Sequence, residues 1–352
     1  MKPHRTIISM LAVLALVAGW TPHSTQAFEL LVSDPGANGV LRFNTQTRAF
    51  DGVFASGGGL TEPTGLTFGP DGNLYVGSLD NTVKRYDGAT GVFIDTFASG
   101  GGLRFPGGLA FGPDGNLYVS SGFSDSVLRY DGRTGAFLDT FATGGGLDSP
   151  TGLVFGPDGN LYVAGSISKI VRYNGTTGEF IDTFVPEFSG GLLNPNDLVF
   201  GPDGNLYAGS GAFTGRVLRY NGQTGAFIDA FASGGGLSLP GGLLFGPDGN
   251  LYVSSPGFTT TQPDMILRYS GVTGAFIDVF ASGDALNFPQ YLTFAPTVAA
   301  VVPGPGALTL LVVGVGGLAL VCRRSQRCGR VRRGSNSPSM EHSSGPLFRR
   351  VS

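Results

Sequence analysis

One nine-residue segment occurs five times, nearly unchanged, and most constrains what this 352-residue chain can fold into. Its first copy is Phe-Gly-Pro-Asp-Gly-Asn-Leu-Tyr-Val at residues 68–76. The other copies begin at Phe111, Phe155, Phe200 and Phe245, so the spacings are 43, 44, 45 and 45 residues. A shortened copy at residues 292–296 ends the series. A period in the mid-forties indicates stacked or radial supersecondary units.

Each repeat contains the pattern of four short strands. Pro-Asp-Gly supplies a fixed φ, a side-chain acceptor and a residue that tolerates positive φ, as a reverse turn between two strands requires. In the first complete repeat we expect strands at residues 65–68, 73–76, 82–86 and 92–97. Complete repeats begin near Gly65, Gly108, Gly152, Asp197 and Gly242.

The two ends of the repeat region complement each other. Residues 28–60 match the last three strands of a repeat, and residues 291–294 match the missing first strand. A lone four-stranded sheet leaves two unpaired edges, whereas six sheets around an axis bury their faces and join the chain ends. The sequence therefore predicts an all-β, six-bladed β-propeller over residues 28–296. An open β-solenoid is the main alternative, but its coils are usually shorter and need no complementary half-units.

The repeat region lacks several reactive residue types. Between Phe28 and Pro296 there is no Trp, His or Cys. This composition excludes a disulfide framework, a cysteine nucleophile, a Ser-His-Asp triad and histidine metal ligands. The same region carries 12 basic and 24 acidic side chains, a net charge of −12. Its surface should therefore repel nucleic acid.

An arginine stands ten residues before an aspartate in every complete repeat. The pairs are Arg85 and Asp95, Arg129 and Asp139, Arg172 and Asp182, Arg219 and Asp229, and Arg268 and Asp278. Folding this segment about its turn places the two side chains on one face of neighbouring strands. A ring of charged ligand sites is one interpretation, but we favour a structural ion pair in each blade. In the N-terminal repeat Arg42 is only nine residues before Asp51, so we expect that pair to be absent.

Residues 1–27 have the features of a signal peptide. Lys2 and Arg5 precede an apolar run at residues 7–18, and Thr-Gln-Ala at residues 25–27 offers a small-residue cleavage site. An uncleaved N-terminal anchor is the other interpretation, but the apolar run is short for a membrane span. We therefore expect the protein to be exported.

The composition changes again after Pro296. We expect a linker with a Pro-Gly-Pro motif at residues 297–306, a transmembrane or sorting helix at residues 307–322, and an Arg-rich disordered tail at residues 323–352. The uncharged run of 15 residues at 307–321 would span about 23 Å as a helix. Positively charged flanks usually stay in the cytoplasm, which would leave the propeller outside the inner membrane.

This C-terminal arrangement resembles the PEP-CTERM sorting signal of Gram-negative bacteria. The resemblance rests on residues 302–306, the apolar run, and Arg323 and Arg324. It implies processing by an exosortase and association with exopolysaccharide or biofilm matrix. Two features depart from the family: Gly304 replaces the expected Glu, and the tail continues to Ser352. An ordinary membrane anchor is the alternative, and the two interpretations predict the same topology.

The repeat itself resembles the NHL-type propeller repeat. The resemblance rests on Pro-x-Gly-Leu-x-Phe-Gly-Pro-Asp-Gly-Asn-Leu-Tyr-Val followed by x-Val-x-Arg-Tyr-Asp, and it covers residues 28–296. Such propellers include binding scaffolds and enzymes, so the resemblance implies the fold and leaves the function open. Streptogramin-lyase-like propellers are one enzyme branch, but their chemistry relies on histidine.

The senescence-marker-protein/gluconolactonase family is also similar in its repeat, and its members bind a divalent metal at the channel mouth. Their Pro-Asn-Gly motif is approached here by Pro-Asn-Asp at residues 195–197. The resemblance implies Asn196 as a metal ligand, with Asp197, Glu62 or Asp148 near the same mouth. Oxygen ligands of this kind suit calcium or another divalent metal such as magnesium. A turn-forming Asn before a strand is the explanation that we favour.

We therefore expect a non-catalytic binding or structural scaffold, without a cofactor, in the cell envelope or the extracellular matrix. A protein or polysaccharide would bind the face formed by the inter-blade loops and the loops between second and third strands. The latter vary most at residues 121–126, 210–215 and 255–264, and variable loops on a constant core typify recognition. Residues 307–322 would contact the membrane. The alternative function is a metal-dependent lactone hydrolase of the gluconolactonase type.

Overall fold

A computed structural model describes residues 28–166, 168–211, 215–257, 262–283 and 285–296. The signal peptide predicted at residues 1–27 lies outside the described residues, as do the linker, helix and tail predicted at residues 297–352. Over the described ranges the chain forms strands, with two short 3-10 segments, η1 (Gly122–Ser124) and η2 (Ser189–Gly191). No helix in these ranges is long and apolar enough to cross a bilayer.

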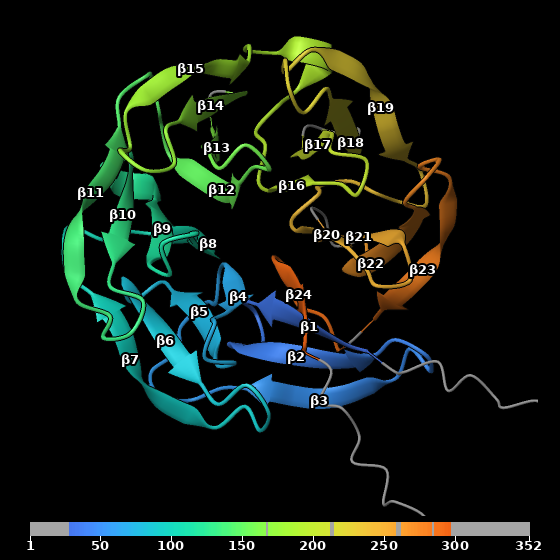
Figure 1. The fold of residues 1–352 in the computed structure, drawn as a ribbon. Coiled ribbons are helices and arrows are strands. Elements are labelled where there is room, and N and C mark those ends of the chain that lie inside the picture. Colours follow the sequence, from blue (N-terminus) through green and yellow to red (C-terminus); the bar gives the residue numbers. More distant parts are fainter. Residues whose placement is uncertain (1–27, 167, 212–214, 258–261, 284, 297–352) are drawn as a thin grey trace, which may run out of the picture. The chain divides into compact units, whose positions relative to one another are not determined.

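The strands form six antiparallel four-stranded sheets arranged around an axis (Figure 1). The first complete blade consists of β4 (Leu66–Phe68), β5 (Leu74–Ser78), β6 (Thr82–Tyr86) and β7 (Phe93–Ser99). The second consists of β8 (Pro106–Phe111), β9 (Leu117–Ser121), β10 (Ser126–Tyr130) and β11 (Phe137–Thr143). The third consists of β12 (Pro150–Phe155), β13 (Leu161–Gly165), β14 (Lys169–Tyr173) and β15 (Phe180–Val185).

Two further complete blades follow the same order from the axis outward. The fourth consists of β16 (Leu198–Phe200), β17 (Leu206–Ser210), β18 (Arg216–Tyr220) and β19 (Phe227–Ser233). The fifth consists of β20 (Leu243–Phe245), β21 (Asn250–Ser255), β22 (Met265–Ser270) and β23 (Phe276–Ser282). The innermost strand of each blade contacts the innermost strand of the next, which closes the ring.

The sixth blade is built from both ends of the repeat region. It contains β24 (Leu292–Phe294), β1 (Glu29–Asp34), β2 (Gly39–Asn44) and β3 (Phe50–Ala55), in that order from the axis outward. Leu30 lies across from Phe294, and Val32 lies across from Leu292. The predicted six-bladed propeller and its closure by residues 291–294 are therefore confirmed.

The tyrosine of the repeated segment explains why that segment is so constant. Tyr75 is fully buried between two blades, and its ring meets Phe97 of its own blade and Phe111 of the next edge-on, with centroids 4.7 and 4.9 Å apart. Its hydroxyl donates to Asp71 Oδ2 at 3.0 Å. Asp71 also accepts the N–H of Asn73 at 3.1 Å, which holds the turn. Each such aromatic pair stabilises by about 0.5–1.5 kcal/mol beyond its burial, so the segment both turns the chain and joins the blades.

The arginine and aspartate that stand ten residues apart form the expected structural ion pairs. Arg85 Nη2 lies 2.6 Å from Asp95 Oδ2, and its guanidinium stacks over the Phe97 ring at 5.0 Å. The same pair forms in the other four complete blades. In the split blade Arg42 lies across from Gly52 and pairs with Glu29 at 3.8 Å, so the irregular spacing there has the expected effect.

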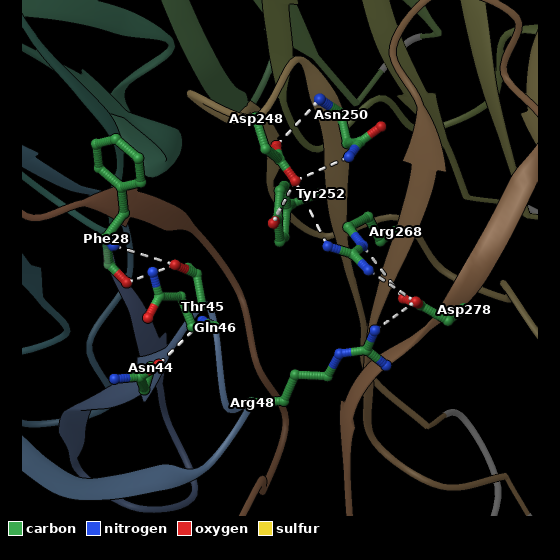
Figure 2. Close-up of polar contacts among 10 residues, drawn as sticks. All are labelled: Phe28, Asn44, Thr45, Gln46, Arg48, Asp248, Asn250, Tyr252, Arg268 and Asp278. Carbon is green, nitrogen blue, oxygen red and sulfur yellow. Dashed lines mark hydrogen bonds and ion pairs between the residues drawn. The ribbon is translucent and has the colours of Figure 1, made fainter. Parts of the chain in front are cut away.

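The split blade has no Gly-Pro-Asp-Gly turn, because its two inner strands come from opposite ends of the repeat region. The turn between β2 and β3 of this blade makes contacts that the other blades lack (Figure 2). Thr45 occupies a position that is Gly88 in the next blade, and its hydroxyl donates to the Phe28 carbonyl at 2.7 Å. Arg48 occupies the position of Gly91, and its Nη2 lies 2.9 Å from Asp278 of the fifth blade. A small cavity of about 350 Å³ lies at this seam, lined in part by Phe28 and Thr45.

Both ends of the propeller lie at the same end of the split blade. Phe28 precedes β1 and Phe294 ends β24, and both line the seam cavity. From there β1 runs six residues toward Pro35, a rise of about 20 Å at 3.3 Å per residue. Pro35 and Gln290 lie at the opposite end of the same strands, where the inter-blade loops begin.

Candidate functional site

A large cavity occupies the end of the propeller axis that the inter-blade loops surround. Its volume is about 860 Å³, which lies within the range of sites that hold drug-sized ligands. Residues from the inter-blade loops and from the loops between second and third strands line it, including Glu62, Leu79 and Pro256. This is the face on which the sequence predicted a partner.

The lining is organised as rings of equivalent positions from the six inter-blade loops. We call the residues that precede the loop prolines the rim ring: Glu62, Phe105, Ser149, Asn194, Leu239 and Phe288. The second ring, two residues further on, is Thr64, Gly107, Thr151, Asn196, Gly241 and Gln290, and all six of its members line the cavity. The third ring is Gly65, Gly108, Gly152, Asp197, Gly242 and Tyr291, of which Tyr291 lines the cavity.

The rim ring holds side chains on a strained backbone. Five of its six residues have positive φ, between 41° at Glu62 and 72° at Phe288. A residue other than glycine in this region costs about 1–2 kcal/mol, and such strain tends to persist at functional positions. The neighbouring loop glycines show that the chain uses glycine where only a turn is required. The rim positions therefore carry side chains at the mouth of the cavity at a cost in stability.

Hydrogen bonds from the preceding blade fix the rim backbone. Asn38 Oδ1 accepts the N–H of Glu62 at 2.9 Å, and Asn81 Oδ1 accepts the N–H of Phe105 at 2.9 Å. Asp125 and Ser168 hold the N–H groups of Ser149 and Asn194 in the same way. The backbone of the mouth is thus preorganised, which reduces the conformational entropy lost when a ligand binds.

The floor of the cavity is polar and is tied across the axis. Asn196 Nδ2 donates to Gln290 Oε1 at 3.1 Å, and Tyr291 Oη donates to the Asn196 carbonyl at 3.1 Å. These bonds join the fourth blade to the split blade and bypass the fifth. Tyr291 is buried, and desolvation together with the nearby charge of Asp197 raises its pKa well above the usual value. It therefore stays neutral and acts as a floor and a donor.

The third ring is narrow because the inner strands approach one another most closely there. A Cβ at Gly65 would lie 2.3 Å from the carbonyl oxygen of Gly107, and a Cβ at Gly242 would lie 2.7 Å from that of Gln290. Asp197 and Tyr291 are the exceptions among these six positions. The Asp197 side chain lies beside Gly152, where a Cβ would be 2.7 Å from Asp197 Oδ1.

Asp197 has no cationic partner among the residues described. Its Oδ1 accepts the N–H of Leu198 at 2.9 Å, and its Oδ2 accepts the N–H of Leu243 at 2.9 Å. Desolvation raises the pKa of this carboxyl to about 7, although the two backbone hydrogen bonds oppose the shift. The side chain serves mainly to join the fourth blade to the fifth.

Two of the four residues that the gluconolactonase resemblance suggested as metal ligands line the cavity. Asn196 lies on the floor and Glu62 on the rim, whereas Asp197 and the exposed Asp148 do not line the cavity. Throughout the described ranges, no three His, Cys, Asp or Glu side chains cluster as a metal site would require. The Asn196 amide is hydrogen-bonded to Gln290, and backbone N–H groups occupy both oxygens of Asp197.

The described lining of the cavity combines apolar walls with few charged groups. Its walls are mostly apolar, with Phe105, Leu239 and Phe288 at the rim, and Glu62 is the one acidic residue in the described lining. No lysine or arginine lines this described cavity. The arrangement offers shape, apolar surface, amide groups and one carboxylate.

Sequence reasoning identified the face but missed most of the residues that define the site. Phe105, Phe288, Gln290 and Tyr291 were not among the expected site residues. A signal was present: in loops that are otherwise nearly constant, the residue before the proline differs from copy to copy. Aligning the repeats by position and seeking the variable columns would have indicated the rim.

Comparisons with solved structures support the architecture. A protein of unknown function from Bacteroides caccae is 15% identical, with a TM-score of 0.60, over 77% of this chain and 100% of that chain. A chain of a nidogen/laminin complex is 19% identical, with a TM-score of 0.57, over 76% of this chain and 98% of that chain. No family model and no curated protein sequence matches. The chain is therefore a six-bladed β-propeller with neighbours of propeller type.

Proposed function

We propose that this chain is a non-catalytic binding scaffold whose partner, a protein or an exopolysaccharide, binds at the mouth cavity. The observation that carries the proposal is the rim ring. Four non-glycine residues with positive φ, Glu62, Phe105, Asn194 and Phe288, line a cavity of about 860 Å³, and they present three kinds of side chain while the propeller beneath them repeats. A constant frame that presents varied side chains around a preformed cavity is suited to recognition.

The position of the chain ends supports a tethered scaffold. Phe28 and Phe294 lie at the seam cavity, at the opposite end of the strands from the mouth. We propose that residues 1–27 direct export and that residues 307–322 anchor or sort the protein as a PEP-CTERM-like signal. A propeller of NHL type attached through its C-terminus would then leave its mouth cavity free for a partner in the envelope or the matrix.

A paired assay tests the proposed function. The purified full chain would be immobilised and exposed to envelope protein extracts and to exopolysaccharide fractions, and in parallel assayed for lactone hydrolysis. We expect retention of a specific partner, and loss of that retention in the variant with Phe105→Ala and Phe288→Ala. The Phe188→Ala variant is the matched control, because Phe188 is exposed and does not line the cavity.

The rival function, a metal-dependent lactone hydrolase, predicts the opposite pattern. Lactonase activity that requires a divalent metal and is lost on Asn196→Ala, with no partner retained, would contradict the scaffold. The scarcity of carboxylates favours the scaffold, because Glu62 is the one acidic residue in the described cavity lining.

A further inference from the structure

The side chains of the rim ring differ in charge and polarity from one side of the mouth to the other, and this difference indicates what the mouth binds. Successive blades place Glu62 between Phe288 on one side and Phe105 on the other. Both phenylalanines are exposed, by 44% and 39%. The opposite side of the rim carries Ser149 and Asn194, which are small and neutral. One sector of the mouth therefore combines a carboxylate with two aromatic faces.

The Glu62 carboxylate is available to a ligand. Its N–H is held by Asn38 at 2.9 Å, so the backbone is anchored while the side chain is free to point into the mouth. Within the described part of the chain, no lysine or arginine forms an ion pair with it. It contrasts with the five outer arginines, each of which holds carboxylates of its own blade.

Charge and aromatic geometry select the sign of the ligand. A cation between two aromatic rings gains about 0.5–1 kcal/mol at an exposed site, and more when it is desolvated. A carboxylate beside it adds to this attraction. An anion would find no cationic lining residue in the described cavity, and it would approach a repeat region with a net charge of −12. The site thus suits a cationic group and disfavours an anionic one.

The apolar surface also extends beyond the cavity, which favours a protein over a small molecule. Phe123 in η1 stacks on Phe105, with centroids 4.9 Å apart and an interplanar angle of 26°. It is 64% exposed and lies outside the cavity lining. A ligand confined to the cavity would leave this ring in water, whereas a polypeptide that enters the mouth would also cover it.

We propose that the mouth binds a basic side chain of a protein partner, with the cation beside Glu62 between Phe105 and Phe288 and flanking apolar residues of the partner against Leu239 and Phe123. This inference rests on the proposed function and specifies its partner. It makes Glu62 the determinant of charge specificity and the two phenylalanines the determinants of affinity.

Two peptides that differ only in charge test the inference. The probes are the acetylated, amidated pentapeptide Gly-Leu-Arg-Leu-Gly and the same peptide with neutral citrulline in place of arginine. Titration of the full chain should show about five- to tenfold tighter binding of the arginine peptide, as expected for a partly exposed cation–π contact combined with an exposed ion pair. Raising the salt concentration should reduce this preference.

Single substitutions test which residues cause the preference for the arginine peptide. Glu62→Gln should reduce the preference to about two- to threefold, because the cation–π contact alone remains. Glu187→Gln, an equal change of charge at an exposed residue outside the cavity, should leave it intact. Phe105→Ala and Phe288→Ala should weaken both peptides.

The outcomes separate this inference from the proposed function. Equal affinity for the two peptides, a preference that Glu62→Gln does not change, or no binding of either peptide would overturn the basic side chain as the ligand. If a polysaccharide or an acidic protein is nevertheless retained in a manner that depends on Phe105 and Phe288, the binding scaffold stands. If nothing is retained, both fail.

Discussion

Tyr291 Oη donates a hydrogen bond of 3.1 Å to the carbonyl oxygen of Asn196, from the split blade to a blade two positions away. Asn196 belongs to the second ring and Tyr291 to the third, in loops that are separated by a whole blade. Their bond spans the axis and forms the floor on which the mouth cavity rests. It also links the C-terminal strand to the body of the ring.

Replacement of Tyr291 by phenylalanine should lower the free energy of unfolding by about 0.5–1.5 kcal/mol. The cost should lie at the lower end, because the Asn196 carbonyl also accepts the N–H of Gly152 at 2.9 Å and is not left unpaired. Tyr291→Ala should cost about 3–5 kcal/mol, because it also opens a cavity at the axis. Urea denaturation of the three proteins measures both values, and equal stability of all three would contradict a role for the floor.

The stability of the fold should decrease as the pH rises from about 5 to 7, above the range in which the aspartates of lowered pKa, such as Asp71 and Asp114, titrate. Desolvation raises the pKa of Asp197 to about 7 and that of Asp34 to about 6, whereas both groups titrate near 3.9 in an unfolded chain. Between these values the folded state holds more protons than the unfolded state, so deprotonation favours unfolding. The contribution of Asp197 is at most about 4 kcal/mol, present in full below pH 4 and lost by pH 7.

The variant Asp197→Asn isolates this effect. Its amide does not ionise, so its unfolding free energy should be flat between pH 6 and 8, apart from what Asp34 contributes near pH 6. Denaturation curves at one-unit intervals of pH provide the measurement. Equal slopes for the wild type and the variant would show that Asp197 does not control the pH dependence.

Substitutions of Arg48, at the seam between the fifth blade and the split blade, should differ in their effect on stability. Arg48 has a φ of 61°, and its side chain pairs with Asp278 at 2.9 Å. Arg48→Ala loses the ion pair, which is worth up to about 1 kcal/mol at an exposed site, and keeps the strain. Arg48→Gly loses the same pair but relieves the strain, so it should be about 1 kcal/mol more stable than Arg48→Ala. Thermal denaturation that ranks alanine above glycine would contradict this account of the turn.

The outer ion pairs should support stability and leave binding unchanged. Arg85→Ala removes the pair with Asp95 and the contact with the Phe97 ring, at a cost of about 1–2 kcal/mol. Asp95→Ala should cost less, because Arg85 retains Asp71 at 3.8 Å and the ring. Affinity for the partner should equal that of the wild type in both variants, and a change in affinity would revive the interpretation of these pairs as ligand sites.

Divalent metals should not stabilise the protein. Glu62 is the one acidic residue in the described cavity lining, and no three His, Cys, Asp or Glu side chains cluster anywhere in the described ranges. Addition of calcium or of a chelator should leave the melting temperature unchanged, since only a ligand that binds the folded state shifts it. A rise with calcium that Asn196→Ala abolishes would favour the lactone hydrolase.

The repeat made the architecture predictable at the level of single strands. The segment at residues 68–76 contains its own turn, and Arg85 and Asp95 are neighbours along one hairpin, so local spacing determines how they meet. Closure was predictable as well, because residues 291–294 match the strand that the N-terminal half-unit lacks. These features depend on residue spacings that every copy of the repeat shares.

The site was less predictable because its residues meet only through closure of the ring. Glu62 and Phe288 are more than two hundred positions apart in the chain, yet they stand on neighbouring loops. The raised pKa of Asp197 follows from close packing at the axis, and spacing carries no sign of it. The expected metal ligands illustrate the same limit: Asn196 and Asp197 are adjacent in sequence, but only Asn196 lines the cavity.

Site-specific photocrosslinking tests most directly whether the mouth is the binding face. A photoreactive group would be placed at Leu239, on the rim, or at Gln223, in the outer turn between β18 and β19, and the full chain incubated with the partner retained from extracts. The account predicts crosslinking from position 239 and none from position 223. Crosslinking from position 223 alone, or equally from both, would contradict it.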